Sequence, residues 1–288
     1  MIIVVGGTSR IGRALRHQLS DRDIQFTTRQ PVTTAAASVS DYRETARHFR
    51  AGAIVVNCVG ISDARRGNLM SVNAQLAQDL AHMANEAGAR HFIQLSSFSV
   101  YGSAHLIDRY TPEGPFSDYG RSKLAADIAL TRSSSSTMQT SILRLPVLIG
   151  HPDVGKLGQL VRLAVRLGGL PIPMPDVQRS MITYLDAAFA IQSLIDQPVA
   201  GITHAADPQP FDYGFLAEQW KQATGKPLKI VRVPRLLTSI ARRLLGKNGA
   251  SLLDDSFLDP LANLAGSLAL PIGLTKALHS TIAAELYR

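Results

Sequence analysis

Short apolar runs alternate with amphipathic segments along the first half of the chain. Between two of these runs, residues 72–87 place Leu76, Leu80 and Met83 at the spacing of a helix with one face toward a core. Alternating strands and helices are typical of βαβ units, in which helices connect parallel strands. We therefore predict an α/β fold with a doubly wound parallel sheet. The predicted strands are residues 2–5, 24–28, 54–58, 92–95 and 141–145.

The pattern changes after Gly150. Residues 151–175 are rich in glycine and proline around a predicted helix at 160–167, as in an excursion away from a sheet. A helix at 186–195 and a strand at 202–206 follow, and the remainder reads as mostly helical with one extended stretch at 228–233. We predict that residues 1–150, rejoined by about 178–206, form the sheet domain. Residues 151–288 then supply a smaller, mostly helical region.

The composition changes this picture mainly through charge. The 288 residues carry a formal net charge of +8, with 45% hydrophobic and 18% charged residues, which is ordinary for a globular protein. An anionic partner is expected, but the basic residues are scattered and form no nucleic-acid motif. No run of about 18 apolar residues could span a bilayer, and no signal peptide precedes the first strand. We predict a cytoplasmic protein without nucleic-acid partners or stable membrane insertion.

For two features of the sequence we favour a purely structural interpretation over a functional one. The chain has one cysteine, Cys58, inside an apolar run, so we expect a buried structural thiol and no intrachain disulfide. Residues 235–247 combine Arg and Lys with leucines at helical spacing. That stretch could lie on a membrane surface, but a helix whose apolar face packs inward is the commoner case.

A glycine-rich loop directly follows the first strand and precedes a predicted helix. In this context the loop and the positive end of the helix dipole favour the diphosphate of a dinucleotide. Gly6 permits a tight turn and Gly12 permits close packing of helix on strand, whereas Ser9 replaces the usual central glycine. The predicted contacts here are Gly6, Thr8, Ser9, Arg10, Ile11 and Gly12.

The end of the second strand predicts the type of dinucleotide. An acidic residue there would bind the ribose 2′-hydroxyl of NAD, whereas an arginine suits the 2′-phosphate of NADP. This chain has Arg29 at that position and a second cation, Arg10, in the loop. We therefore predict NADP(H), with NAD(H) as the alternative and both arginines as solvated surface residues as a third reading.

Candidate catalytic residues come from two further segments. Ser97 stands just after the fourth predicted strand, and Tyr119 and Lys123 are four residues apart, on one face of a predicted helix. A nearby ammonium lowers the pKa of a phenol, so that tyrosine can exchange a proton with a carbonyl or alcohol. A serine hydroxyl on the same oxygen stabilises negative charge that develops there. We see no metal-ligand pattern.

Together these segments resemble the extended short-chain dehydrogenase/reductase superfamily, in its NAD-dependent epimerase/dehydratase group, over nearly the whole chain. The resemblance implies a Rossmann domain and catalytic roles for Ser97, Tyr119 and Lys123, with Lys123 also holding the nicotinamide ribose. It places Asp41 near the adenine and Pro146 near the nicotinamide, and Arg179 on the diphosphate of a nucleotide-sugar substrate. Further cofactor contacts implied are Cys58, Val59, Gly60 and Asn73, and further substrate contacts are Phe98 and Ser99.

Three reactions occur on such a scaffold. A 4,6-dehydratase of this group has two carboxylates after its catalytic serine or threonine, whereas this chain has Phe98 and Ser99 there. The arginines favour NADPH and hence reduction, and the second half is similar to bacterial reductases of polysaccharide (O-antigen) biosynthesis. These reduce the 4-keto group of a UDP-2-acetamido-2,6-dideoxy sugar. A nucleotide-sugar 4-epimerase with tightly bound NAD is the alternative, although Val147 replaces the asparagine of UDP-galactose 4-epimerases.

A non-catalytic NADP(H)-binding regulator is an alternative of another class. Relatives of that kind usually lose the tyrosine–lysine pair, which this chain keeps as Tyr119 and Lys123. A small-molecule nucleotide sugar is therefore the expected partner, and a homodimer is a further expectation from the resemblance.

Overall fold

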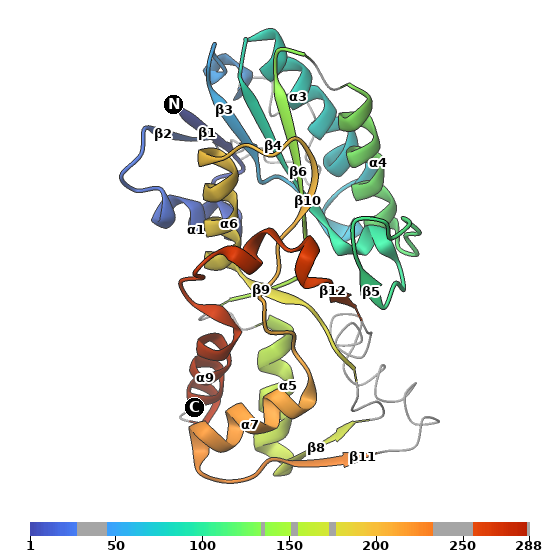
Figure 1. The fold of residues 1–288 in the computed structure, drawn as a ribbon, viewed down its shortest axis with the longest axis vertical. Coiled ribbons are helices and arrows are strands. Elements are labelled where there is room, and N and C mark those ends of the chain that lie inside the picture. The colour runs from blue at the N-terminus through green and yellow to red at the C-terminus, as the bar shows by residue number, and fades with distance from the viewer. Residues whose placement is uncertain (28–44, 134–135, 151–154, 173–176, 233–255, 287–288) are drawn as a thin grey trace.

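The structure is a computed structural model that describes residues 1–27, 45–133, 136–150, 155–172, 177–232 and 256–286. Six strands form a parallel sheet in the order β10-β6-β4-β3-β1-β2, in the upper part of Figure 1. From β1 the chain adds β2 on one side and the other strands on the opposite side, so the predicted doubly wound α/β fold is confirmed. The strands are β1 (Ile2–Val5), β2 (Ile24–Thr27), β3 (Ile54–Asn57), β4 (His91–Ser97), β6 (Gln139–Leu145) and β10 (Gly201–His204).

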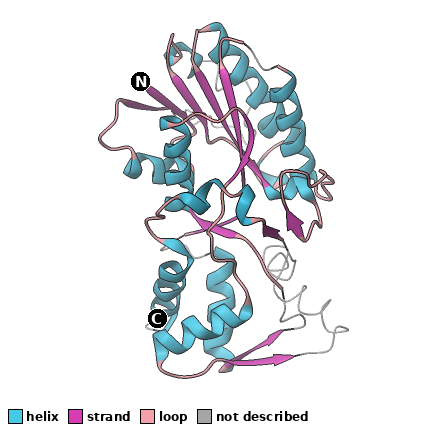
Figure 2. Ribbon diagram, viewed as in Figure 1, coloured by secondary structure: helices cyan, strands magenta, loops and turns pink. Residues whose placement is uncertain are grey.

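Helices cover both faces of this sheet (Figure 2). On one face α1 (Arg10–Gln18) packs against α6 (Tyr184–Asp196), and on the other lie α3 (Leu76–Glu86), which continues the π-helical turn Ser71–Gln75, and α4 (Asp118–Arg132). Alternate side chains of β1 enter different cores, Val4 with Leu15 of α1 and Ile3 with Leu80 of α3. Burial of each such side chain contributes about 1.5–3 kcal/mol. Both faces must therefore be apolar, which explains the uninterrupted apolar runs.

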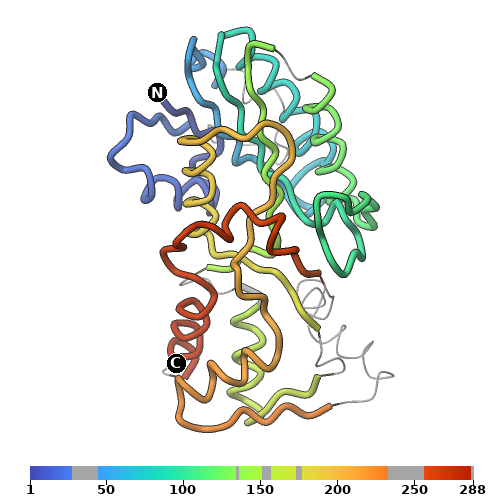
Figure 3. Tube along the Cα trace, viewed as in Figure 1, coloured from blue at the N-terminus to red at the C-terminus, as the bar shows by residue number. Residues whose placement is uncertain are grey.

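A second core fills the lower part of the molecule. It packs leucines of α5 (Gly155–Leu167), α7 (Tyr213–Thr224) and α9 (Gly273–Leu286) against one another. At its lower edge β8 (Gly169–Ile172) pairs with β11 (Lys229–Arg232), as the trace in Figure 3 shows. The residues predicted to be extended at 228–233 include β11.

The two parts adjoin at the carboxyl ends of the sheet strands. β6 continues through Pro146 into β7 (Val147–Ile149), which pairs with β9 (Met181–Thr183) just before α6. Asp186 near the start of α6 is fully buried and accepts the backbone N–H groups of Ile272 (2.9 Å) and Gly273 (3.0 Å), which lead into α9. These hydrogen bonds hold the lower helices against the edge of the sheet where functional side chains gather in α/β folds.

Candidate active site

The glycine loop between β1 and α1 is packed too tightly for side chains at its ends. A Cβ added at Gly12 would lie 2.5 Å from the Gly6 carbonyl oxygen, and Gly6 itself has a φ of +87°. Only glycine adopts that conformation without strain, and only glycine lets α1 approach the loop so closely. Gly6 and Gly7 are buried in this loop, whereas Thr8 is exposed just before the N-terminus of α1.

Ser9, the departure from the usual glycine pattern, caps the helix. Its Oγ accepts the backbone N–H of Gly12 at 2.9 Å, and its φ of −63° and ψ of 162° are those of an N-cap residue. The side chain satisfies one of the N–H groups that a helix start leaves without an intrahelical partner. Serine therefore fits the position for a local reason, and α1 begins directly after it, at Arg10.

Arg10 is exposed at the first turn of α1. Its Nη1 donates to the Tyr184 hydroxyl at 3.2 Å, and its guanidinium lies 5.8 Å from the centre of that ring. Tyr184 is the first residue of α6, so the contact holds the guanidinium beside the glycine loop. Two further predicted cofactor contacts lie outside the described residues, namely Arg29 at the end of the second strand and Asp41, which is expected near the adenine.

The loop after β3 reaches the candidate catalytic helix. Asn73 fixes this loop by two hydrogen bonds, from Ile61 N to Oδ1 (2.9 Å) and from Nδ2 to Ile61 O (2.8 Å). It also donates to Ser122 Oγ of α4 at 2.9 Å. A Cβ added at Gly60 would lie 3.1 Å from Lys123 Nζ. The structure thus brings the predicted residues Gly60, Asn73 and Lys123 together.

Ser97 and Tyr119 meet where β4 ends and α4 begins. Ser97 lies at the last position of β4, its Oγ donates to Ser99 Oγ at 3.1 Å, and a further hydrogen bond joins Ser97 to the Tyr119 side chain. A Cβ added at Gly120 would lie 2.4 Å from the Ser99 carbonyl oxygen, so this glycine permits the approach of α4. The serine–tyrosine pair therefore depends on a glycine that follows the tyrosine.

The pKa of Tyr119 differs from the expectation. Burial raises the pKa of its hydroxyl, and the hydrogen bond with Ser97 opposes that rise in part. The Lys123 Nζ donates to the Leu95 carbonyl oxygen at 3.0 Å. The expectation of a lowered phenol pKa was therefore wrong. Tyr119 is a neutral phenol at pH 7.

Lys123 is almost fully buried, with 4% of its surface exposed. Burial lowers the pKa of its ammonium to about 8, and the nearby Asp127 carboxylate opposes that shift. The thiol of Cys58 is buried beside it, and burial raises the pKa of this thiol to about 12. Cys58 is therefore an uncharged thiol, as a structural cysteine is expected to be.

The predicted substrate contacts lie in both parts of the molecule. Phe98 is buried and packs edge-on against Tyr101 and His204, with ring centres 6.2 and 5.9 Å away. Arg179 lies in the lower part, where its backbone exchanges two hydrogen bonds of 2.8 Å with Phe211. Pro146 is buried between β6 and β7, and Ile11 is buried in the core under α1.

The family follows from a sequence comparison. Residues 2–205 match the model of the NAD dependent epimerase/dehydratase family. The chain belongs to this family.

The proteins that this chain resembles include both an epimerase and a reductase. A UDP-glucose 4-epimerase of Vibrio cholerae is 27% identical over 220 residues, which is 71% of this chain and 62% of that protein. The chain thus spans less than two thirds of that relative. Among solved structures, the dTDP-4-dehydrorhamnose reductase of Bacillus anthracis in complex with NADP has a TM-score of 0.71 at 16% identity, and 98% of each chain is covered. MoeE5 in complex with UDP-glucuronic acid and NAD has a TM-score of 0.72 at 17% identity, covering 98% of this chain and 97% of MoeE5.

Sequence reasoning missed a buried polar cluster behind the candidate catalytic residues. Arg144 on β6 is 2% exposed and donates to Asp127, Tyr101 and Glu113 at 2.9, 2.7 and 3.0 Å. Tyr101 OH also lies 2.5 Å from His204 Nε2. Two sequence signals could have indicated this cluster, namely an arginine within an apolar strand and an aspartate four residues after Lys123. A buried charge requires a partner of opposite sign.

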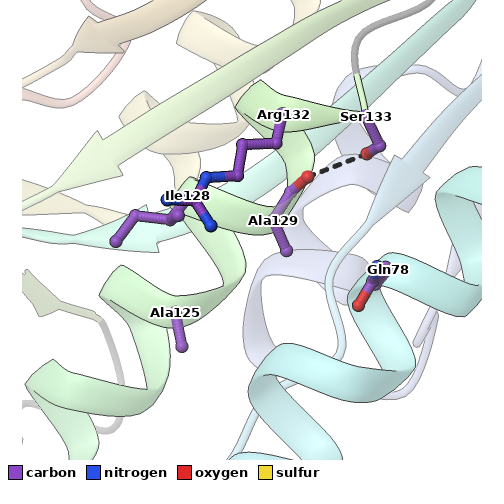
Figure 4. A pocket seen from close by; sticks show the side chains of 6 residues that line it. All are labelled: Gln78, Ala125, Ile128, Ala129, Arg132 and Ser133. Atoms are coloured by element: carbon purple, nitrogen blue, oxygen red, sulfur yellow. Dashed lines mark hydrogen bonds between the residues drawn. The ribbon is translucent and has the colours of Figure 1, made fainter.

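A hollow on the outer side of α4 has no part in this site (Figure 4). Its volume is about 480 Å³, and it lies between α3 and α4, where Ile128 is 43% exposed. It is lined by Gln78, Ala125, Ile128, Ala129, Arg132 and Ser133. No helix in the described ranges is long and apolar enough to cross a membrane, and no cluster of His, Cys, Asp or Glu there could hold a metal ion.

Proposed function

We propose that this chain reduces the 4-keto group of a nucleotide-linked sugar with NADPH, the substrate being of the UDP-2-acetamido-2,6-dideoxy-hexos-4-ulose type. One observation carries this proposal, namely that Ser97, Tyr119 and Lys123 gather at the carboxyl end of β4. This edge of the sheet also carries the glycine loop, separated from β4 by β3. Membership in the epimerase/dehydratase family supports an NAD(P)-dependent enzyme of nucleotide sugars.

The residues present fit the cofactor. Glycines at positions 6 and 12 keep side chains away from the loop, and the positive end of the α1 dipole favours a diphosphate beside it. In this proposal Thr8, Ser9, Ile11 and Gly12 hold the diphosphate, and Arg10 contributes to the site of the 2′-phosphate. Cys58 to Gly60 line the site together with Pro146, and Lys123 holds the nicotinamide ribose. Arg29 and Asp41, outside the described residues, keep their predicted roles.

The proposed chemistry divides between cofactor and protein. When bound, NADPH supplies the hydride that the C4 carbon of the sugar accepts. Ser97 donates a hydrogen bond to the C4 oxygen, which stabilises the negative charge that develops on it. Tyr119 transfers its phenolic proton to the same oxygen, so the product is the alcohol. A neutral phenol suits this role, because a proton donor must carry its proton at the working pH.

A nucleotide-sugar 4-epimerase with tightly held NAD is the second candidate. The similarity to the Vibrio cholerae UDP-glucose 4-epimerase favours it. An epimerase must first remove a proton from the C4 hydroxyl, and a tyrosine with a raised pKa is seldom in the deprotonated form that this step requires.

The lower part is the proposed binding region for the nucleotide sugar. We propose that Arg179 binds the diphosphate of the substrate. Phe98 and Ser99, in the short helix that follows Ser97, contact the sugar in this proposal. A homodimer and a cytoplasmic location stay predictions from the sequence.

A direct assay tests the reductase proposal. Purified protein is incubated with NADPH and a UDP-4-keto-6-deoxy-HexNAc, and absorbance at about 340 nm follows the cofactor while mass spectrometry identifies the sugar. We expect NADPH oxidation and a sugar product two mass units heavier, from one hydride and one proton. Interconversion of UDP-GlcNAc and UDP-GalNAc without net change of cofactor would assign the epimerase function instead.

Arg10 is expected to contribute to the choice of NADPH over NADH. We expect Arg10→Ala to weaken NADPH binding by about tenfold while NADH binding changes little, because a charged hydrogen bond is worth roughly 1.5–3 kcal/mol. Tyr184→Phe removes the hydroxyl that holds Arg10 and should cause a smaller loss in the same direction. Fluorescence titrations with both cofactors measure this, with exposed Arg132→Ala as a control. Equal losses for NADPH and NADH would place Arg10 at the shared diphosphate.

A further inference from the structure

The face of α4 that lies against the sheet buries two opposite charges one turn apart. Lys123 is 4% exposed and Asp127 is 1% exposed, and residues four apart on a helix share a face. Their side chains form no direct ion pair, since the Lys123 ammonium donates to Leu95 O. Burying charge is costly unless other groups compensate for it, so both side chains need a physical explanation.

Asp127 is anchored through one of its two oxygens. Its Oδ2 accepts hydrogen bonds from Ser96 Oγ and Arg144 Nε, both at 2.9 Å. Its Oδ1 is equally buried and has no hydrogen-bond partner in the part of the chain that the structure describes. The carboxylate is therefore held at a defined place through Oδ2 alone.

Behind Asp127 the charges continue in alternation. Arg144 contacts Asp127 on one side and Glu113 on the other, so Lys123, Asp127, Arg144 and Glu113 form a charge array of alternating sign. At its far end a cavity of about 360 Å³ includes Glu113, Arg144 and His204 in its lining. Burial raises the pKa of Asp127, and Arg144, Ser96 and Lys123 each oppose that rise. The Arg144 guanidinium, 2.9 Å from Asp127 Oδ2, favours the ionised form of this carboxylate.

The groups that face Lys123 come from three elements. Its own helix contributes Tyr119 and Asp127, β4 contributes the Leu95 carbonyl oxygen, and the segment after β3 contributes Cys58. Tyr119 and Cys58 are uncharged at pH 7, because burial raises the pKa of each side chain. Among the described residues, Asp127 is thus the anion that acts on the Lys123 ammonium.

We propose that Asp127 is a positioning residue that keeps Lys123 protonated and seated on the Leu95 carbonyl, and that Arg144 holds Asp127 in place for this task. The catalytic importance of that charge rests on the proposed function, whereas the charge state itself does not. Burial alone would favour a neutral amine. Asp127 supplies the opposing field, so a lysine with a pKa of about 8 remains a cation at pH 7.

The test is a titration that needs neither substrate nor cofactor. The chain contains seven lysines, and protein labelled with ¹³C at lysine Cε gives one signal for each, the signal absent from Lys123→Met being that of Lys123. We expect this signal to titrate near pH 8 in the native protein and at clearly lower pH in Asp127→Asn, which keeps the shape of the side chain and removes its charge.

Ser96→Ala is the matched control. It removes a hydrogen bond to the same carboxylate oxygen but leaves the charge of Asp127, so the Lys123 signal should titrate near its native pH. An unchanged titration of Lys123 in Asp127→Asn would overturn the proposal. If Asp127→Asn does not fold, the reciprocal measurement decides. In Lys123→Met the carboxyl carbon of Asp127 must titrate at higher pH than in the native protein, and an unchanged value contradicts the coupling.

Activity provides a separate readout. If the reductase assay succeeds, the alkaline limb of the pH profile of kcat/KM should move to lower pH in Asp127→Asn, with activity lost at pH 8 and largely regained near pH 6. A merely structural role would lower the profile at every pH without moving that limb. A shifted lysine titration without any reductase activity would support the role of Asp127 and contradict the proposed function.

Discussion

Tyr119→Phe is expected to lower kcat/KM of the proposed reductase by a factor of about 10² to 10⁴, the usual contribution of a positioned proton donor. The substitution removes only the hydroxyl that hydrogen-bonds with Ser97, so the ring can remain where α4 places it. Affinity for NADPH should stay within about threefold, because the proposed cofactor contacts are elsewhere, on the glycine loop and Lys123. Steady-state kinetics and a fluorescence titration with NADPH measure the two effects separately.

Tyr110→Phe is the control for this loss. Tyr110 lies in the loop after β5 (Leu106–Ile107), and its side chain is 82% exposed. The same chemical change there should leave kcat/KM unchanged. Full activity of Tyr119→Phe would contradict the proton-donor role, and unchanged cofactor binding without activity in either protein would favour the regulatory alternative.

Arg144→Met is expected to lower the free energy of unfolding by about 3–5 kcal/mol, the cost of removing one partner of a buried ion pair. Methionine fills much of the same space, but it leaves the Asp127 carboxylate buried without its main cation. The folded variant then holds a proton on Asp127 more tightly than the unfolded chain does. The deficit should therefore shrink as the pH falls and this carboxyl becomes protonated. Urea unfolding at several pH values measures it.

An exposed pair provides the matched control. Arg22 and Asp196 lie 3.1 Å apart with both side chains 40% exposed, and Arg22→Met should cost less than about 1 kcal/mol. Far-UV circular dichroism follows the whole fold, and the single tryptophan, Trp220 on α7, reports on the lower part. A loss below about 1 kcal/mol in Arg144→Met would show that the buried array contributes little. Restored stability in Arg144→Met combined with Asp127→Leu would support the cost assigned to the isolated carboxylate.

Much of the sheet could be predicted from the sequence because strands buried on both faces must be apolar throughout. β1 has the predicted bounds, and β3 and β6 differ from the prediction by one to two residues at their ends. The short strands β5 and β12 (Phe257–Leu258) were not predicted, because two residues carry no readable pattern. Their pairing is set by contacts between segments about 150 positions apart in the chain.

The sequence could predict residues of the candidate site wherever the chemistry requires a residue type at a fixed local spacing. The glycine loop follows a strand, and Tyr119 and Lys123 share a helix face, so both motifs are encoded within a few residues. The reason for Ser9 was not readable. Its fit depends on the φ and ψ angles of a helix cap, which the structure shows directly.

The sequence by itself determined the parallel sheet and the loop at its edge, and it predicted Ser97, Tyr119 and Lys123 as the candidate site, because periodicity and local spacing express burial and shared faces. Only the tertiary structure decided the protonation of these groups. The pKa of Tyr119 is raised and that of Lys123 is lowered by burial, and the latter is opposed by an aspartate that Arg144 holds from another strand. Burial and electrostatic interactions depend on distances between segments far apart in the chain, which the order of residues does not express.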